Sequence, residues 1–105
     1  MRTNIENAIL GTFLLANDTG DDMENVFTLD TSIFKSAFRK RVAEQINEVK
    51  DNAYGFLSYT IEEKVEGTRY EQEFTDMIGQ ASMTLFVAKK YHDKLVADDK
   101  MEELL

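Results

Sequence analysis

The sequence contains no cysteine, no proline and no tryptophan, and it has a single histidine, His92. Without cysteine the chain can form no disulfide scaffold, no thiolate zinc site and no cysteine nucleophile, and it fits a reducing cytosol. The absence of proline favours long helices with few rigid turns. The five glycines are scattered, so the sequence has neither a P-loop nor a dinucleotide-binding fingerprint.

These absences remove most catalytic constellations. A serine triad would need His92 beside a nucleophile, and no G-x-S-x-G turn supports one. Neither H-E-x-x-H nor E-x-x-H occurs, and the acidic stretch at residues 16–22 has Gly20 in the wrong place for an EF-hand loop. His92 lies among three lysines on an expected helix, so we expect it on the surface. We expect no enzyme activity, no cofactor and no metal site.

The charge is strongly acidic. Twelve basic and 20 acidic residues give a net charge of −8, and residues 51–105 hold 12 of the acids but only six of the bases. This balance disfavours direct nucleic-acid binding as the main activity. It favours a basic protein partner or self-association. The alternative is that the charge only keeps a small domain soluble. No apolar run is long enough to span a membrane, so we expect a cytoplasmic protein.

The 105 residues, 43% of them apolar, are enough for one core and too few for two. We expect a helical interaction domain over residues 1–97 and an acidic, helix-prone tail over residues 98–105. The tail either continues the last helix or is mobile.

Apolar residues recur every three or four positions through most of the chain, which is the helical repeat. Thr3 with Glu6, and Thr68 with Glu71, have capping-box spacing, and Gly67 suits a helix C-cap. A short alternation at residues 70–74 is the best strand candidate, but the capping signal favours helix. Gly11 lies inside an expected helix. It indicates either that a neighbouring helix approaches closely or that the helix simply tolerates a glycine there. The expected helices cover Asn4–Leu15, Met23–Phe27, residues 31–49, Tyr54–Val65, Tyr70–Gly79 and Met83–Leu95.

The longest uninterrupted pattern runs from Asp30 to Lys50, with Asp30 or Thr31 as its N-cap. Its apolar residues fall on one stripe at about 3.6 residues per turn: Phe34, Phe38, Val42, Ile46 and Val49. We therefore predict an all-α, compact single-domain bundle of about six helices around a central helix near residues 31–49.

The same stretch carries a dense basic cluster, formed by Lys35, Arg39, Lys40 and Arg41. Steps of 100° from Phe38 place these residues at about 60°, 100°, 200° and 300°, so they encircle the helix. A single phosphate-tracking face is therefore disfavoured. The four residues are candidate protein-binding residues, with the Lys35/Arg39 side as the first choice. Alternatively, their stems cover the edges of the core.

Three segments resemble the N-terminal domain of DnaB-type replicative DNA helicases. IENAILGTFLL is similar to the opening helix of that family, and MENVFTLDTSIFKSAFRKRVAEQINEV is similar to its short second helix, loop and long helix. FTDMIGQASMTLFVAKKYHDKLV is similar to its last helices. The resemblance covers about residues 4–96, and the motifs are apolar spacings rather than catalytic signatures. The helicase-binding C-terminal domain of bacterial primases is similar in fold and fits the same residues.

The resemblance implies a non-enzymatic protein–protein interaction module in DNA replication. Its partners would be helicase subunits, primase or a loader, with homo-oligomers possible. ATP hydrolysis would belong to a motor that these residues do not contain. The alternative is a small acidic regulator or inhibitor, such as one from a mobile element, that binds a basic host protein. A helical DNA-binding regulator is a third hypothesis, and the acidic charge disfavours it.

Overall fold

The computed structural model describes residues 1–52 and 55–105, and over this part of the chain it is all-helical and has no strand. It contains five α-helices and two 3-10 turns: α1 (Arg2–Thr19), η1 (Met23–Asn25), η2 (Thr31–Ile33), α2 (Ala37–Val49), α3 (Leu57–Val65), α4 (Glu71–Gly79) and α5 (Leu85–Leu104). The all-α prediction is confirmed. Over residues 1–52 and 55–105 the α-helices number five rather than six, because the short helical turn expected at Met23–Phe27 forms as the 3-10 turn η1 and not as an α-helix. Tyr54, expected in the fourth helix, lies outside the described residues.

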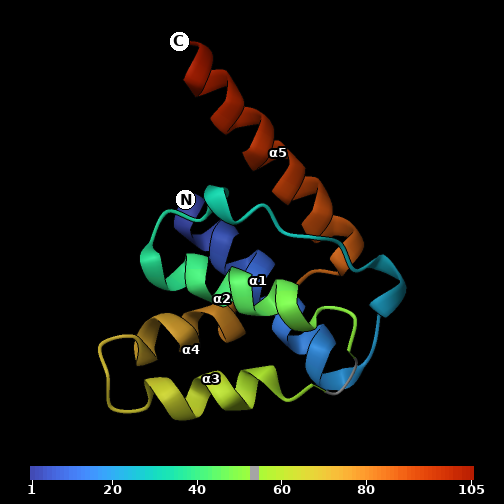
Figure 1. The fold of residues 1–105 in the computed structure, drawn as a ribbon, viewed down its shortest axis with the longest axis vertical. Helices are drawn as coiled ribbons and strands as arrows, with labels where there is room; N and C mark the ends of the chain where they lie inside the picture. The colour runs from blue at the N-terminus through green and yellow to red at the C-terminus, as the bar shows by residue number, and fades with distance from the viewer. Residues whose placement is uncertain (53–54) are drawn as a thin grey trace.

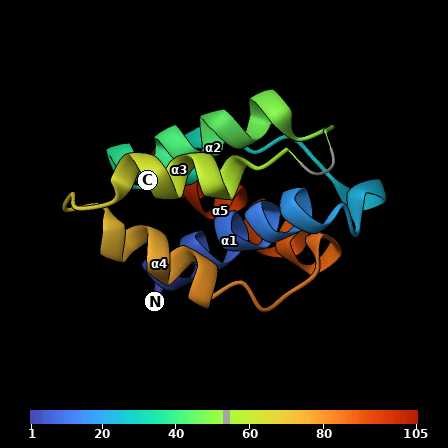
Figure 2. The same cartoon turned by 90° about the horizontal axis from the view of Figure 1, so that it is seen from below.

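The centre of the fold is α1, which lies in the middle of the other four helices (Figures 1 and 2) and contacts each of them. Every residue of α1 from Glu6 to Leu14 is buried. The prediction of a central helix near residues 31–49 is therefore wrong. The physical reason is that α1 carries apolar or small side chains around most of its circumference, whereas α2 keeps a charged outer face and can bury only one side.

Gly11 lets α1 approach α4 closely. A Cβ atom at this position would lie 1.9 Å from the backbone oxygen of Met77, a distance at which the backbone would have to shift. Of the two interpretations of Gly11, the structure confirms the close approach.

The segment before α2 differs from the expected helix. Asp30 caps only the turn η2, by accepting a hydrogen bond from the Ser32 N–H at 3.0 Å. The chain then becomes extended, and α2 begins at Ala37 with Ser36 as its N-cap, whose hydroxyl accepts from the Arg39 N–H. Phe34 lies in the extended part and is fully buried. The irregular backbone thus places Phe34 in the core without a helix.

Helices α3 and α4 form a hairpin below α1 in Figure 1. Gly67 follows the end of α3 with a φ of 76°, so its predicted role at the helix C-terminus is confirmed. The short alternation at residues 70–74 belongs to helix rather than strand, since α4 begins at Glu71.

The last helix, α5, is continuous through the acidic stretch to Leu104. Leu85, Ala88, His92 and Leu95 bury one side of its first half, whereas residues 100–105 are all exposed. Figure 1 shows this end projecting beyond the rest of the molecule. Of the helices in the described part of the chain, none has the length and apolar character needed to cross a membrane.

Candidate protein-binding site and its ion-pair network

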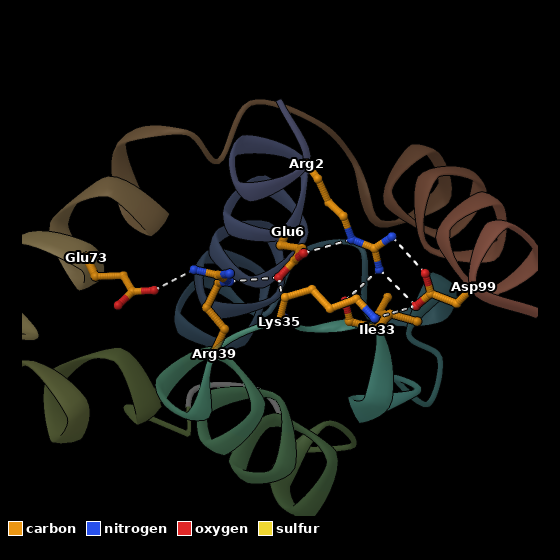
Figure 3. Close-up of polar contacts among 7 residues, drawn as sticks. All are labelled: Arg2, Glu6, Ile33, Lys35, Arg39, Glu73 and Asp99. Carbon is orange, nitrogen blue, oxygen red and sulfur yellow. Dashed lines mark hydrogen bonds and ion pairs between the residues drawn. The ribbon is translucent and has the colours of Figure 1, made fainter. Parts of the chain in front are cut away.

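The basic cluster predicted as a protein-binding site divides into buried and exposed members. Arg39, which belonged to the side chosen first as a partner-binding surface, has a side chain that is only 9% exposed. Its Nε donates to Glu6 Oε1 and its Nη1 donates to Glu73 Oε1, both at 2.7 Å (Figure 3). Arg39 thus links α2 to α1 and α4. A guanidinium engaged in this way is not presented to a partner.

Glu6 is the anion at the centre of this network. Its side chain is 1% exposed and accepts three hydrogen bonds: from Arg2 Nε at 3.0 Å, Arg39 Nε at 2.7 Å and the Lys35 backbone N–H at 2.9 Å. A buried carboxylate is costly unless it is paired and hydrogen-bonded in this manner. The predicted capping box is therefore absent, since α1 begins at Arg2 and the Glu6 side chain serves the core instead.

A second group of charges fastens α5 to the start of α1. Arg2 binds Asp99 in a bidentate manner, with Nη1 to Oδ1 at 2.8 Å and Nη2 to Oδ2 at 2.9 Å, and Nη2 also donates to the backbone oxygen of Ile33. Lys35 Nζ lies 3.1 Å from Asp99 Oδ2 (Figure 3). The hydrogen bond from Arg2, and then that from Lys35, lowers the pKa of Asp99, and Asp99 in turn raises the pKa of Arg2. Residues 97 positions apart in sequence are thereby joined.

Lys40 and Arg41 are the exposed remainder of the cluster, together with the half-exposed side chain of Lys35. Within residues 1–52 and 55–105, neither Lys40 nor Arg41 lies within 4.0 Å of a carboxylate. Protein binding by Lys35, Lys40 and Arg41 stays a prediction. Because Arg39 is buried, it cannot form one contiguous surface with Lys35.

His92 was expected on the surface, and this too is wrong. It is buried, and its Nε2 accepts a hydrogen bond from the Asp30 backbone N–H at 2.9 Å, while its ring meets that of Phe27 edge-on at 5.0 Å. Its Nδ1 lies 3.1 Å from Asp93 Oδ1. The pKa of Asp93 is lowered by the hydrogen bond from Lys89 first and by the contact with His92 second. Since Nε2 must be unprotonated to accept, His92 serves as a structural link between α5 and the segment before α2.

Glu6 and His92 are the residues whose roles sequence reasoning missed. A signal for Glu6 was present, because it is the only acid in an otherwise apolar and small-residue run from Ile5 to Leu14. A charge in such a run either disrupts the packing or has a partner brought by another element. For His92 there was no comparable signal, since the neighbouring lysines are exposed on the same helix.

The concave surfaces of the described residues include one small cavity and larger open grooves. The enclosed cavity around Phe13 and Ile46 has a volume of about 10 Å³, no more than one water needs. Two open grooves are larger. One, of about 390 Å³, lies between α1 and the start of α5, and the other, of about 440 Å³, lies between α3 and α4. Among the residues that the structure describes, no three His, Asp or Glu side chains gather as metal ligands.

Comparison with protein-family models, with curated proteins and with solved structures finds no match to this chain.

Proposed function

We propose that the chain is a non-enzymatic protein–protein interaction module of the kind found at the N-terminus of DnaB-type replicative helicases. Its contacts would be with helicase subunits, primase or a loader during DNA replication. The segments that resemble the family fall mainly on α1, α2, α4 and α5. The proposal therefore rests on the sequence resemblance and on the surface of these helices.

The observation that carries the proposal is the exposed apolar surface of α5. Phe86 and Met101 are 57% and 59% exposed, and Val87 and Tyr91 are also exposed. Single exposed apolar residues are ordinary, but a series along one helix is typical of an interface.

Two measurements test the proposal together. Light scattering over a concentration series should show oligomers that grow with concentration, and the primase of the source cell should bind the purified chain in biolayer interferometry. A folded chain that stays strictly monomeric and also ignores primase would rule the proposal out.

A second candidate is a small acidic regulator that binds a basic protein. It is favoured by the groove between α3 and α4, which is lined by Glu62 of α3 and Glu71 of α4 together with Phe74 and Ile78. Affinity capture should then recover a basic protein with the native chain and lose it with Glu62→Gln/Glu71→Gln. Glu44→Gln/Glu48→Gln on the exposed face of α2 is the control for net charge. Equal recovery with both double variants would exclude the groove.

A further inference from the structure

The outer face of α5, together with Leu105 directly after its end, carries a stripe of six residues that recur alternately four and three positions apart. They are Val87, Tyr91, Lys94, Asp98, Met101 and Leu105, and this set is called the α5 stripe below. The spacing is that of the a and d positions of a heptad, which face a partner helix in a coiled coil. The stripe is apolar at both ends and charged in the middle.

The α5 stripe is open to solvent. Leu85, Ala88, His92 and Leu95, which hold α5 against the body, are centred about 120° away around the helix axis. Tyr91 and Met101 are 43% and 59% exposed, and the Lys94 and Asp98 side chains are 71% and 51% exposed. The end of the helix that carries Met101 projects past the body (Figure 1). A second helix could therefore lie along the stripe without displacing the core.

We propose that α5 pairs antiparallel with α5 of a second copy of this chain. In the register that matches the stripe with itself, Lys94 of each copy faces Asp98 of the other. Tyr91 then faces Met101, and Val87 faces Leu105. Apolar side chains thus meet apolar ones, and opposite charges meet. A parallel pair would set Lys94 against Lys94 and Asp98 against Asp98, so charge complementarity selects the antiparallel orientation.

The surface next to the α5 stripe also supports a second copy of this chain as the partner. Tyr91 lines the groove of about 390 Å³, together with Ile5, Ala8 and Met83. In the antiparallel register, Met101 of the second copy lies beside this groove, and methionine readily fills irregular apolar surfaces. Lys94 Nζ is 3.0 Å from Asp98 Oδ2 within one helix, so an exchange of partners between copies needs only rotamer changes. Because a Lys and an Asp occupy the central core positions, the dimer is weak and dissociates on dilution.

This inference rests on the proposed self-association and identifies the surface that makes it. The test is sedimentation velocity over about 1 µM to about 1 mM, a range that covers weak association. Lys94→Glu and Asp98→Lys each set like charges against one another and should raise the dissociation constant at least about tenfold, or 1.4 kcal/mol. An equimolar mixture of the two variants restores both opposite-charge layers and should dimerise as the native chain does. Lys94→Glu/Asp98→Lys should dimerise by itself.

Glu103→Lys is the matched control, since it makes the same charge change as Asp98→Lys at an exposed position on the other side of the helix. It should leave the dissociation constant within about twofold. Circular dichroism confirms that each variant is folded. If the native chain oligomerises and either single variant oligomerises to the same extent, the α5 contact is overturned. The proposed function then still stands. A strictly monomeric native chain also overturns it, and primase binding then decides the proposed function separately.

Discussion

The two longest helices have nearly the same length and opposite surroundings. α1 has 18 residues and is buried without interruption from Glu6 to Leu14, whereas α5 has 20 residues, buries one side of its first half and is exposed from Lys100 onward. A helix can be covered on all sides only if its side chains are apolar or small around its circumference and if any charge in it is paired. α1 meets both conditions. α5 carries charges from Lys89 to Glu103, so only one side of it, with an apolar stripe, is covered by the body.

The largest expected effect comes from removing the buried anion of α1. Glu6→Ala leaves the Lys35 N–H without an acceptor and the buried Arg39 with only Glu73. Breaking a buried pair from one side costs about 3–5 kcal/mol, so we expect a loss of that size in the free energy of unfolding, measured by urea denaturation. Glu48→Ala on the exposed face of α2 should change the free energy of unfolding by less than about 0.5 kcal/mol. Equal effects would contradict the burial of Glu6.

The next effect tests the close approach of α1 to α4. Gly11→Ala should destabilise by about 1–3 kcal/mol, because the added Cβ meets the Met77 carbonyl and overpacking outweighs the gain in helix propensity. Gly79→Ala is the matched helical control, since a Cβ there meets nothing within 4 Å. It should be neutral or stabilise by up to about 1 kcal/mol. Thermal unfolding of both variants makes the comparison, and a stabilising Gly11→Ala would refute the packing.

A smaller effect concerns the junction at which α5 leaves the body. The folded state holds the pKa of Asp99 below its ordinary value of 3.8 through Arg2 and Lys35. A lowered carboxyl pKa contributes stability that is fully present above the ordinary value and is lost as the pH falls through the folded one. We therefore expect Asp99→Asn to cost about 1 kcal/mol at pH 7. Below about pH 4 the difference in the free energy of unfolding between Asp99→Asn and the native chain should become smaller.

Urea denaturation at a series of pH values measures this difference. The pKa values of Asp30 and Asp93 are also lowered, by the Ser32 and Lys89 hydrogen bonds respectively, so the Asp99→Asn variant should still lose stability at low pH. If the difference in the free energy of unfolding between Asp99→Asn and the native chain grew towards low pH, the Arg2–Asp99 pairing would be contradicted.

The smallest effect is expected at the projecting end of α5. Met101→Gln at low protein concentration should change the free energy of unfolding by less than about 0.5 kcal/mol, because the side chain is exposed and glutamine forms helix about as well as methionine. The equivalent change in α1, Leu10→Gln, buries an amide in the core and should destabilise severely. Similar urea midpoints for the two variants would remove the distinction between the helices.

Much of the fold was predictable because it depends on local chemistry. Helical periodicity gave the all-α class and placed α3 and α4 to within a few residues, and Gly67 ended α3 as its missing Cβ allows. The start of α2 was misplaced by six residues, because a stripe at helical spacing does not exclude an extended segment that buries Phe34 by another route. Phe38, assigned to the core, is only half-buried and stacks on Tyr70.

The candidate site was less predictable, because charge spacing within a helix says nothing about partners from other elements. Arg39 and Lys40 are adjacent basic residues with similar sequence surroundings, yet one is buried and the other is exposed. The difference comes from Glu6 and Glu73, which lie 33 and 34 positions away from Arg39. No local pattern encodes that separation.

The sequence by itself determined the helices, most of their ends and the acidic surface, since these follow from propensity, periodicity and composition. Only the tertiary structure decided which helix is central, which charges are buried and which face of α5 is left open. The reason is energetic: apolar burial is nondirectional, so a stripe shows that a side is covered but not by what. A buried carboxylate such as Glu6, by contrast, is tolerable only where it is fully paired, and for this the fold brings Arg39 from α2 to join Arg2, which lies one turn away on α1.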